Sequence, residues 1–293
     1  MNPSHSPTSP STVGTWRGAA LATVSLLVAV VISVSPAAAR QHRVPTSDLL
    51  THSPLAACTA GDRLGADTPT RLRIATWNIR AARSASVDAI AVELQAMQAD
   101  LIALQEVDVR VRRTGFVDEP AALAIALGFH YVFAASIKWD AGDYGLAVLS
   151  RWPLTDVRRH RLDSTVAAEP RIVLEVSVCP GGRPLHVFNH HADGRAASRQ
   201  GGFTELRGIV QADVGRGTLV LGDFNEYADA PGVRGLIDAS LVDLGAERAM
   251  NTAPSGRIDY IFADGFLARL MSPARVWPTD KSDHHAVLAD LDW

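Results

Sequence analysis

The segment Lys281-Ser282-Asp283-His284-His285 stands directly before an apolar run, 286–291, that predicts a β-strand. Five other polar clusters lie at the ends of apolar, strand-like runs upstream: Thr76-Trp77-Asn78, Gln105-Glu106, Asn189-His190-His191, Gly222-Asp223-Phe224-Asn225 and Arg257-Ile258-Asp259-Tyr260. Acids, amides and histidines at so many strand ends suit metal-assisted hydrolysis of a phosphoester. That chemistry needs charge neutralisation, an activated water and a stabilised leaving oxygen.

An alternation of strands and helices surrounds these clusters from residue 71 onward. Strands are predicted at 72–76, 101–104, 146–149, 172–178, 185–189, 218–221, 258–262, 274–277 and 286–291. Helices are predicted after the N-cap Ser86, over 118–127 ahead of Gly128, over 203–214 and over 233–236. About nine strands with few crossover helices favour two packed sheets with helices outside, rather than one doubly wound sheet.

The first 70 residues have a different composition. Residues 1–39 begin Ser/Pro-rich, contain an apolar run at 18–34 and end in Pro36-Ala37-Ala38-Ala39, which is typical of a cleaved export signal. A retained membrane anchor is the alternative, although the run is short for a span. Residues 40–70 lack periodicity and predict a linker, leaving 71–293 as the folded domain. The chain is therefore expected to be secreted or held in the cell envelope.

Cysteine count and charge add two expectations. In an exported protein the pair Cys58 and Cys179 favours a disulfide over two free thiols. The net charge is −3, and since residues 1–39 hold one Arg and no acid, the chain without them carries −4. This balance argues against tight polynucleotide binding, which relies on clustered Lys and Arg. The basic clusters at 110–113 and 158–161 are read as solvated loop charge, with substrate steering as the alternative.

Individual residues in the clusters suggest separate roles. Glu106 follows a buried-strand pattern, so its carboxylate should emerge at the strand end and suit a hard cation such as Mg²⁺; a solvated Glu is the alternative. Asn78 ends a comparable strand and could orient a carboxylate or phosphate oxygen. Asp223 and Asn225 share a face if the backbone stays extended, where they could handle a water or an oxyanion; an Asx-turn is the alternative.

The histidines add acid–base and phosphate-binding groups. His191, at the end of its strand, could donate a hydrogen bond to phosphate. A carboxylate bonded to one imidazole nitrogen fixes the tautomer and raises the basicity of the other nitrogen. Asp259 or Asp283 could play that part for His284.

Seven motifs in order resemble those of the endonuclease/exonuclease/phosphatase superfamily. Members include pancreatic-type deoxyribonucleases, abasic-site endonucleases, bacterial sphingomyelinases and inositol polyphosphate 5-phosphatases. The resemblance runs from about Leu72 to Trp293 and is carried by these stretches: Ile74-Ala75-Thr76-Trp77-Asn78-Ile79, Leu104-Gln105-Glu106-Val107, Gly145-Leu146-Ala147-Val148-Leu149-Ser150-Arg151, Asn189-His190-His191, Gly222-Asp223-Phe224-Asn225, Arg257-Ile258-Asp259-Tyr260 and Ser282-Asp283-His284.

The resemblance implies an α/β (α+β) fold, a four-layer sandwich of two packed mixed β-sheets flanked by helices. It implies Mg²⁺, with Mn²⁺ and Ca²⁺ as alternatives, on Glu106 with Asn78 and Asp283 nearby. It places the site at one edge of the two sheets.

The resemblance also implies catalytic roles for five residues. Asp223 and Asn225 would position the water and stabilise the pentavalent centre. His284 would pair with Asp259, and His191 would contact phosphate. Whether Asp223 or His284 takes the proton of the water is left open.

Two departures from the family pattern affect substrate binding. Asn189-His190-His191-Ala192 replaces the more common Asn-Thr-His-Leu, so His191 matches by register. Tyr144-Gly145 is followed by Leu146 rather than Asn, which removes one polar contact. Arg171 could supply a phosphate contact instead; a surface Arg is the alternative reading.

These observations predict an exported metal-dependent phosphodiesterase of the endonuclease type. A phosphomonoesterase acting on inositol phosphates or lipid headgroups is the alternative, because one catalytic centre serves both. A non-catalytic binding protein should have lost at least one polar cluster, and all are present. The substrate is expected to be a nucleic acid, a phospholipid headgroup or an inositol phosphate. The protein is expected to be a monomer without an obligate protein partner.

Overall fold

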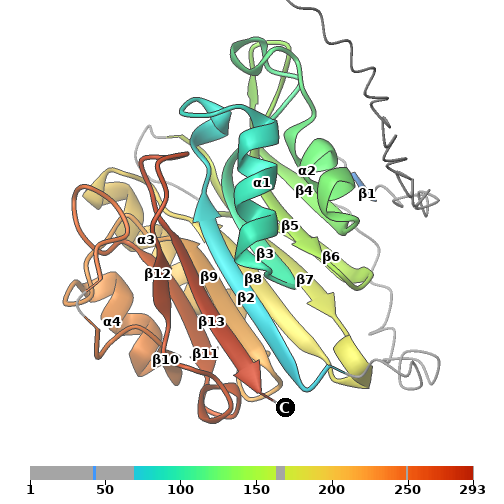
Figure 1. Ribbon diagram of the computed structural model, residues 1–293. Coiled ribbons are helices and arrows are strands. Elements are labelled where there is room, and N and C mark those ends of the chain that lie inside the picture. Colours follow the sequence, from blue (N-terminus) through green and yellow to red (C-terminus); the bar gives the residue numbers. More distant parts are fainter. Residues whose placement is uncertain (1–41, 44–68, 163–168, 249, 293) are drawn as a thin grey trace, which may run out of the picture. The chain divides into compact units, whose positions relative to one another are not determined.

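The strands of the computed structural model form two sheets, and residues 42–43, 69–162, 169–248 and 250–292 are described (Figure 1). The first sheet has the order β1-β4-β5-β3-β2-β13-β12. Its strands are β1 (His42–Arg43), β4 (His130–Trp139), β5 (Gly142–Ser150), β3 (Leu101–Val109), β2 (Arg71–Asn78), β13 (Ala286–Asp292) and β12 (Arg275–Trp277). The second has the order β10-β11-β9-β8-β7-β6. Its strands are β10 (Leu241–Asp243), β11 (Asp259–Asp264), β9 (Thr218–Asp223), β8 (Leu185–His191), β7 (Arg171–Val178) and β6 (Leu154–Leu162).

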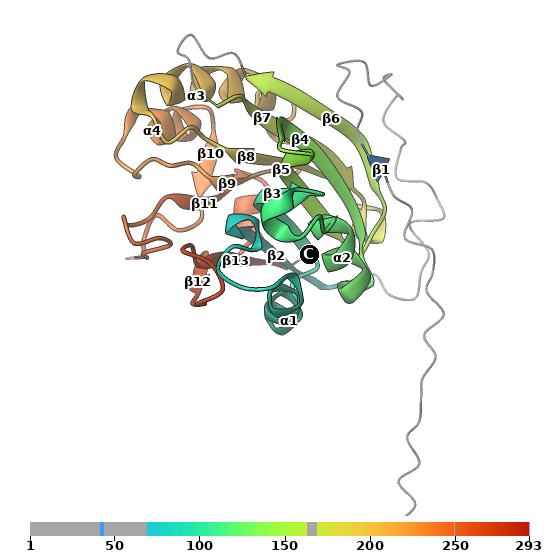
Figure 2. The same cartoon turned by 90° about the horizontal axis from the view of Figure 1, so that it is seen from above.

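Helices cover the outer face of each sheet (Figure 2). Helices α1 (Val87–Met97) and α2 (Glu119–Leu127) pack on the first sheet, and α3 (Ala196–Val210) and α4 (Pro231–Asp238) pack on the second. Both sheets mix parallel and antiparallel pairs. The predicted sandwich of two mixed sheets flanked by helices is confirmed.

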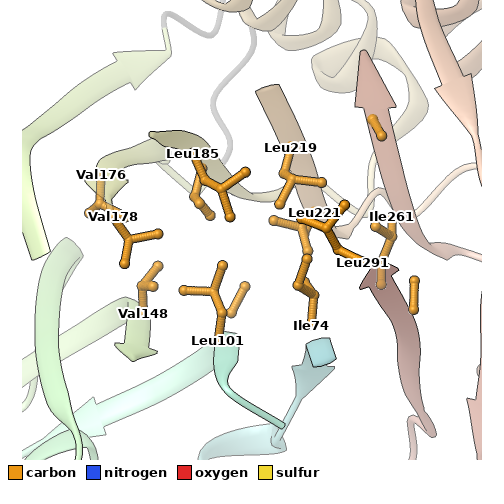
Figure 3. Close-up of a cluster of buried hydrophobic side chains, with 14 of the residues drawn as sticks. Ile74, Leu101, Val148, Val176, Val178, Leu185, Leu219, Leu221, Ile261 and Leu291 are labelled. Carbon is orange, nitrogen blue, oxygen red and sulfur yellow. The ribbon is translucent and has the colours of Figure 1, made fainter. Parts of the chain in front are cut away.

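The inner faces of the two sheets form the main hydrophobic core (Figure 3). Leu101 of the first sheet and Leu185 and Leu219 of the second are all at most 1% exposed. Because successive residues of a strand point to opposite faces, Ile74 of β2 lies in this core while Trp77 packs outward beneath α1. Burial on both faces explains why the central strands read as continuous apolar runs.

Two helices begin and end where capping chemistry predicts. The Ser86 side chain accepts a hydrogen bond from the Ala89 backbone N–H at the start of α1. The Asp118 side chain does the same for α2, which ends at Gly128 with φ of 70°. A residue without a Cβ adopts this left-handed conformation at little cost.

Several elements differ from the sequence prediction. Strands β4, β6 and β10 were not predicted, and β6 contains the basic run read as loop charge. That run lies on an edge strand, where Arg158 and His160 both bond Glu175, at 2.6 and 2.5 Å. Helix α3 begins at Ala196 rather than near 203, because packing of its apolar face outweighs the low helix propensity of Gly201-Gly202.

Residues 1–39 and Cys58 lie outside the described residues, so the export signal and the disulfide stay predictions. Within the predicted linker, β1 pairs in parallel with β4. None of the helices in the described ranges is long and apolar enough to cross a membrane.

Candidate functional site

The polar clusters meet at one end of the two sheets, uppermost in Figure 1. Parallel strands β2 and β3 end near Asn78 and Glu106, and parallel strands β8 and β9 end at His191 and Asp223. Strand β11 runs antiparallel to β9, so its first residue, Asp259, pairs with Asp223. Strand β13 runs antiparallel to β2, so the segment that precedes it returns to the same end.

Glu106 is turned toward the site by an irregularity in β3. The register between β3 and β5 shifts between Leu104 and Val107, and Glu106 has a left-handed φ of 52°. Such a bulge redirects a side chain and costs backbone strain, which clusters at functional sites. The Glu106 carboxylate accepts a hydrogen bond from Asn78 Nδ2 at 3.1 Å.

Asn78 bridges two carboxylates with one amide. Its Nδ2 donates to Glu106 and, at 3.0 Å, to Asp223 Oδ2. Its Oδ1 accepts from the Arg80 backbone N–H at 3.0 Å. Because both ends of the amide are used, Asn78 holds the two carboxylates in place rather than offering a free oxygen of its own.

Asp223 collects hydrogen-bond donors in a buried position. Besides Asn78, the Asn225 backbone N–H donates to its Oδ1 at 2.9 Å, and His191 Nε2 lies 3.4 Å from its Oδ2. Burial and the neighbouring Asp259 nevertheless raise the pKa of Asp223 to about 7, against the lowering effects of His284 and Asn78. A carboxylate with this pKa exchanges protons near neutral pH.

His284 and Asp259 form a hydrogen-bonded pair beside Asp223. His284 Nδ1 lies 2.9 Å from Asp259 Oδ2, and His284 Nε2 lies 3.8 Å from Asp223 Oδ2. Burial lowers the pKa of His284, but the bond to Asp259 outweighs it and raises the pKa to about 9. Asp259 is held by two backbone N–H groups that donate to Thr252 Oγ1, its own and that of Ile258. Near neutral pH the imidazole therefore carries a proton on both nitrogens.

Two groupings of ligands could hold a cation. The ligand atoms of Asp223, Asp259 and His284 lie within 4.8 Å of one another. The His284–Asp259 hydrogen bond already occupies two of these atoms, so the pair is better suited to proton chemistry. Glu106 and Asp223, linked by one amide, present the oxygen ligands that a hard divalent ion prefers. Positive charge there would also offset the cost of burying Asp223. We take Glu106 and Asp223 as the candidate metal site.

Asp283 lies farther toward solvent than expected for a metal ligand. Its carboxylate is 3.1 Å from Arg80 Nε, and its side chain is 41% exposed. The neighbouring Ser282 hydroxyl donates to the Asn78 backbone oxygen at 2.7 Å, which attaches this segment to the end of β2. The structure thus places Asp283 at the rim, beside the group formed by Asn78 and Glu106.

Asn225 does not share a face with Asp223 as an extended backbone would require. Strand β9 ends at Asp223, and Asn225 has a left-handed φ of 49°. Its N–H bends back to Asp223, which is the Asx-turn alternative, and its Nδ2 donates to the Ala192 backbone oxygen at 3.1 Å. The expectation of a shared face is therefore wrong, although the residue still lies beside Asp223.

Arg171 extends the site along β7 and β8. Its Nη1 donates to His191 Nδ1 at 3.1 Å and lies 3.1 Å from Glu169 Oε1, while its Nε is buried without a hydrogen-bond partner among the described residues. Since an Arg can only donate, His191 accepts on Nδ1 and carries its proton on Nε2, facing Asp223. Burial and Arg171 lower the pKa of His191 well below its usual value, so this histidine is neutral.

The structure also brings in residues that the sequence analysis did not select. Tyr144 is buried beside Arg171, which hydrogen-bonds it, and near Glu106. The indole Nε1 of Trp77 donates to the His284 backbone oxygen at 2.9 Å. The Tyr144-Gly145 pair ahead of an apolar strand could have pointed to Tyr144. Nothing in the sequence points to Trp77, because its role depends on a contact 207 residues away.

The raised pKa of His284 predicts how stability changes with pH. The pKa rises from 6.5 to about 9 on folding, so the stabilisation is fully present below pH 6.5 and is lost as pH rises through 9. The shift corresponds to about 3 kcal/mol. With chelator present, the free energy of unfolding should fall over this window. In His284→Gln the fall in the free energy of unfolding should be smaller by about that amount. Denaturant titration at several pH values measures it. The same pH dependence in both proteins would show that the pKa of His284 is not raised on folding.

The arrangement of the fold and the site defines a class of enzymes that hydrolyse phosphoesters. The sequence model of the endonuclease/exonuclease/phosphatase family matches residues 75–284, and the chain belongs to this family. A search of curated proteins found no match to the chain.

Solved structures share the fold at low sequence identity. An endonuclease/exonuclease/phosphatase from Beutenbergia cavernae is 24% identical, with 76% of this chain and 71% of that chain covered and a TM-score of 0.62. An AP endonuclease from Archaeoglobus fulgidus is 21% identical, with 76% and 100% covered and a TM-score of 0.59. A 3′–5′ exonuclease from Neisseria meningitidis is 21% identical, with 76% and 100% covered and a TM-score of 0.58.

Proposed function

We propose that the protein is an exported Mg²⁺-dependent phosphodiesterase of the nuclease type. The observation that carries the proposal is the Asn78 amide, which holds Glu106 and Asp223 together beside the His284–Asp259 pair. A cation-binding group and a proton-transfer group are therefore adjacent, as phosphoester hydrolysis requires. Export is supported by the sequence pattern of residues 1–39.

Three parts of the site have separate roles in binding the cation and the phosphate. Mg²⁺ held by Glu106 and Asp223 would neutralise charge on the phosphate and on the leaving oxygen. Arg171, a half-buried cation whose Nε has no hydrogen-bond partner among the described residues, would bind a phosphate oxygen. His191 holds Asp223 through its Nε2–H and positions Arg171 through its Nδ1.

The pKa values of Asp223 and His284 assign the proton transfers. His284 already holds its proton at neutral pH because its pKa is about 9, so it is poised to donate to a phosphate oxygen as negative charge develops. Asp223, with a pKa of about 7, is the group that can accept the proton of the attacking water. We therefore assign the role of general base, left open between these two residues, to Asp223.

Nucleic acid is the proposed substrate class. Several structural relatives are named as nucleases, and one is described as a 3′ phosphatase bound to a product DNA hairpin. A small pocket with a cavity volume of about 20 Å³ lies beside Arg171 and is lined by Leu162, Glu169, Arg171, His190, Ala192, Asp193, Ser198, Arg199 and Gly202. It has room for about one water molecule, so a larger group attached to a phosphate at Arg171 would lie outside it.

A substrate panel with and without chelator tests the proposal. Plasmid DNA and a single-stranded oligonucleotide should be hydrolysed with Mg²⁺ and spared with chelator, whereas inositol polyphosphates and sphingomyelin should react poorly. Glu106→Gln should require a much higher Mg²⁺ concentration, because an amide is a weaker ligand than a carboxylate. Asp238→Asn, at the exposed end of α4, is the matched control and should behave as wild type.

The proposal fails on either of two results. Hydrolysis that is unaffected by chelator would remove the cation from the reaction. If the enzyme prefers a phosphomonoester or a lipid headgroup over every nucleic acid, the proposed catalytic centre is kept but the proposed substrate class is wrong. Protein recovered from the culture medium should begin at Arg40. An uncleaved chain anchored in the membrane would overturn cleavage of the signal, and an uncleaved chain in the cytoplasm would overturn export.

A further inference from the structure

The β4–β5 hairpin reaches the same end of the first sheet as Glu106. In the strand register Trp139 is the last residue of β4 and pairs with Gly142, while Tyr144 pairs with β3. A Cβ on Gly142 would lie 2.1 Å from the backbone oxygen of Val109 in β3. The hairpin is thus held tightly against the strand that carries Glu106.

An ion pair between the partly exposed Arg113 and the buried Asp108 lies behind this hairpin. Arg113 Nε and Nη2 donate to the two oxygens of Asp108 at 2.7 and 2.8 Å, and Asp108 is fully buried. The Asp108 backbone N–H in turn donates to Glu119 Oε2 at 2.8 Å. Two parallel bonds fix the plane of a guanidinium as well as its position. Arg113 stays partly exposed in the short turn between β3 and α2, so it is a solvated loop charge whose guanidinium is also fixed by Asp108.

The fixed guanidinium packs against two aromatic rings. The Arg113 Cζ atom lies 4.8 Å from the centre of the Trp139 ring and 5.4 Å from that of Tyr144. The two ring centres are 6.3 Å apart. Tyr144 is buried, whereas Trp139 is 41% exposed. Arg113 and Tyr144 thus hold an indole that still presents surface to solvent.

Tyr144 connects this indole to the place where phosphate would bind. Arg171 hydrogen-bonds Tyr144, and the charge of Glu106 acts on the same hydroxyl. Tyr144 therefore lies between Trp139 and the groups that would bind phosphate and the cation, which are Arg171 and Glu106.

We propose that Trp139 is a stacking platform for a nucleobase next to the scissile phosphate. The proposal rests on the proposed function and narrows its substrate to single-stranded or locally unpaired nucleic acid, whose bases are free to stack. Aromatic side chains bind bases of any sequence because every base has a flat π-face. Such binding needs few surface cations, which suits a chain with a net charge of −3.

The surroundings of Trp139 argue against insertion into a lipid bilayer. The hairpin carries an ion pair between Lys138 and Asp143 at 2.7 Å, and Arg112 lies 3.4 Å from Asp140 at its tip. Burying these charges in hydrocarbon would be costly. A nucleobase can stack on the indole while the charges remain in water.

Steady-state kinetics on a short oligothymidylate test the platform. Trp139→Ala should raise KM about 5- to 150-fold, the range that corresponds to losing one stacked base, and change kcat little. Trp139→Phe should retain most of the affinity because it keeps an aromatic ring. Hydrolysis of glycerophosphocholine, a phosphodiester without a ring, should be the same in all three proteins. Phe266→Ala removes another exposed aromatic, from a turn after β11 at the other end of the second sheet, and is the control.

A binding measurement separates this proposal from the proposed function. Fluorescence anisotropy of a labelled oligothymidylate in the presence of chelator reports binding without hydrolysis. If the wild type binds the oligothymidylate and Trp139→Ala does not, the stacking proposal is supported even if the wild type does not hydrolyse it. Equal binding by the two proteins, or no binding by either, overturns the platform. Loss of binding to phosphatidylcholine vesicles in Trp139→Ala, with KM for the oligonucleotide unchanged, would assign the residue to a membrane instead.

Discussion

Asp223→Asn should lower kcat by about 10³- to 10⁴-fold, the upper part of the range for losing a general base. The amide keeps the shape of the side chain but cannot accept the proton of the attacking water. It also removes one of the two carboxylates of the candidate metal site, so the affinity for Mg²⁺ should fall. Single-turnover kinetics at saturating Mg²⁺ measure the loss of proton transfer apart from the loss of the cation.

The pH profile identifies the role of Asp223 more specifically. In the wild type, the rate should rise as Asp223 ionises, with an acid limb at or below pH 7, because bound Mg²⁺ favours the charged form. Asp223→Asn should lack this limb. The fold of the variant is checked by its melting temperature with chelator. A variant that retains the acid limb would assign the proton transfer elsewhere.

His284→Ala should lower kcat by about 10²- to 10⁴-fold. Alanine removes the imidazolium that lies 3.8 Å from Asp223 and is poised to stabilise charge on the phosphate. Because the pKa of His284 is about 9, the wild-type rate should decline above that pH, and the variant should lose this alkaline limb. Wild-type turnover in His284→Ala would remove the residue from the mechanism.

Asp259→Asn provides a matched test of the pair. It keeps a polar group 2.9 Å from His284 Nδ1 but removes the negative charge that raises the pKa. The alkaline limb should therefore move down from about 9 toward the ordinary value for histidine. An unmoved limb would show that a group other than His284 causes it.

Much of the fold and of the site's membership could be predicted from local patterns. Ser86 and Gly128 mark helix ends because capping is a short-range effect. Apolar runs that end in polar clusters predicted where Glu106 and Asp223 emerge, because parallel strands bring their carboxyl ends to one edge. These signals are contained within a few residues and do not depend on tertiary context.

The remaining features depend on contacts between distant segments. The bulge that turns Glu106 arises from pairing between β3 and β5, which is not encoded in the sequence around Glu106 alone. In the sequence, Arg113 resembles any other surface cation, because its ion pair with the buried Asp108 depends on the fold. Strand β6 escaped notice because its side chains are charged, and it is stabilised by ion pairs with Glu175 rather than by alternating apolar residues.

The place of β13 in the first sheet has a consequence for the timing of activity during synthesis. This strand inserts between β2 and β12, and the segment before it delivers His284 to the carboxylates of strands made much earlier. A ribosome must therefore release residues through β13 before the complete site can assemble. A polypeptide truncated before His284 lacks the His284–Asp259 pair, so its hydrolytic activity should be far below that of the full chain.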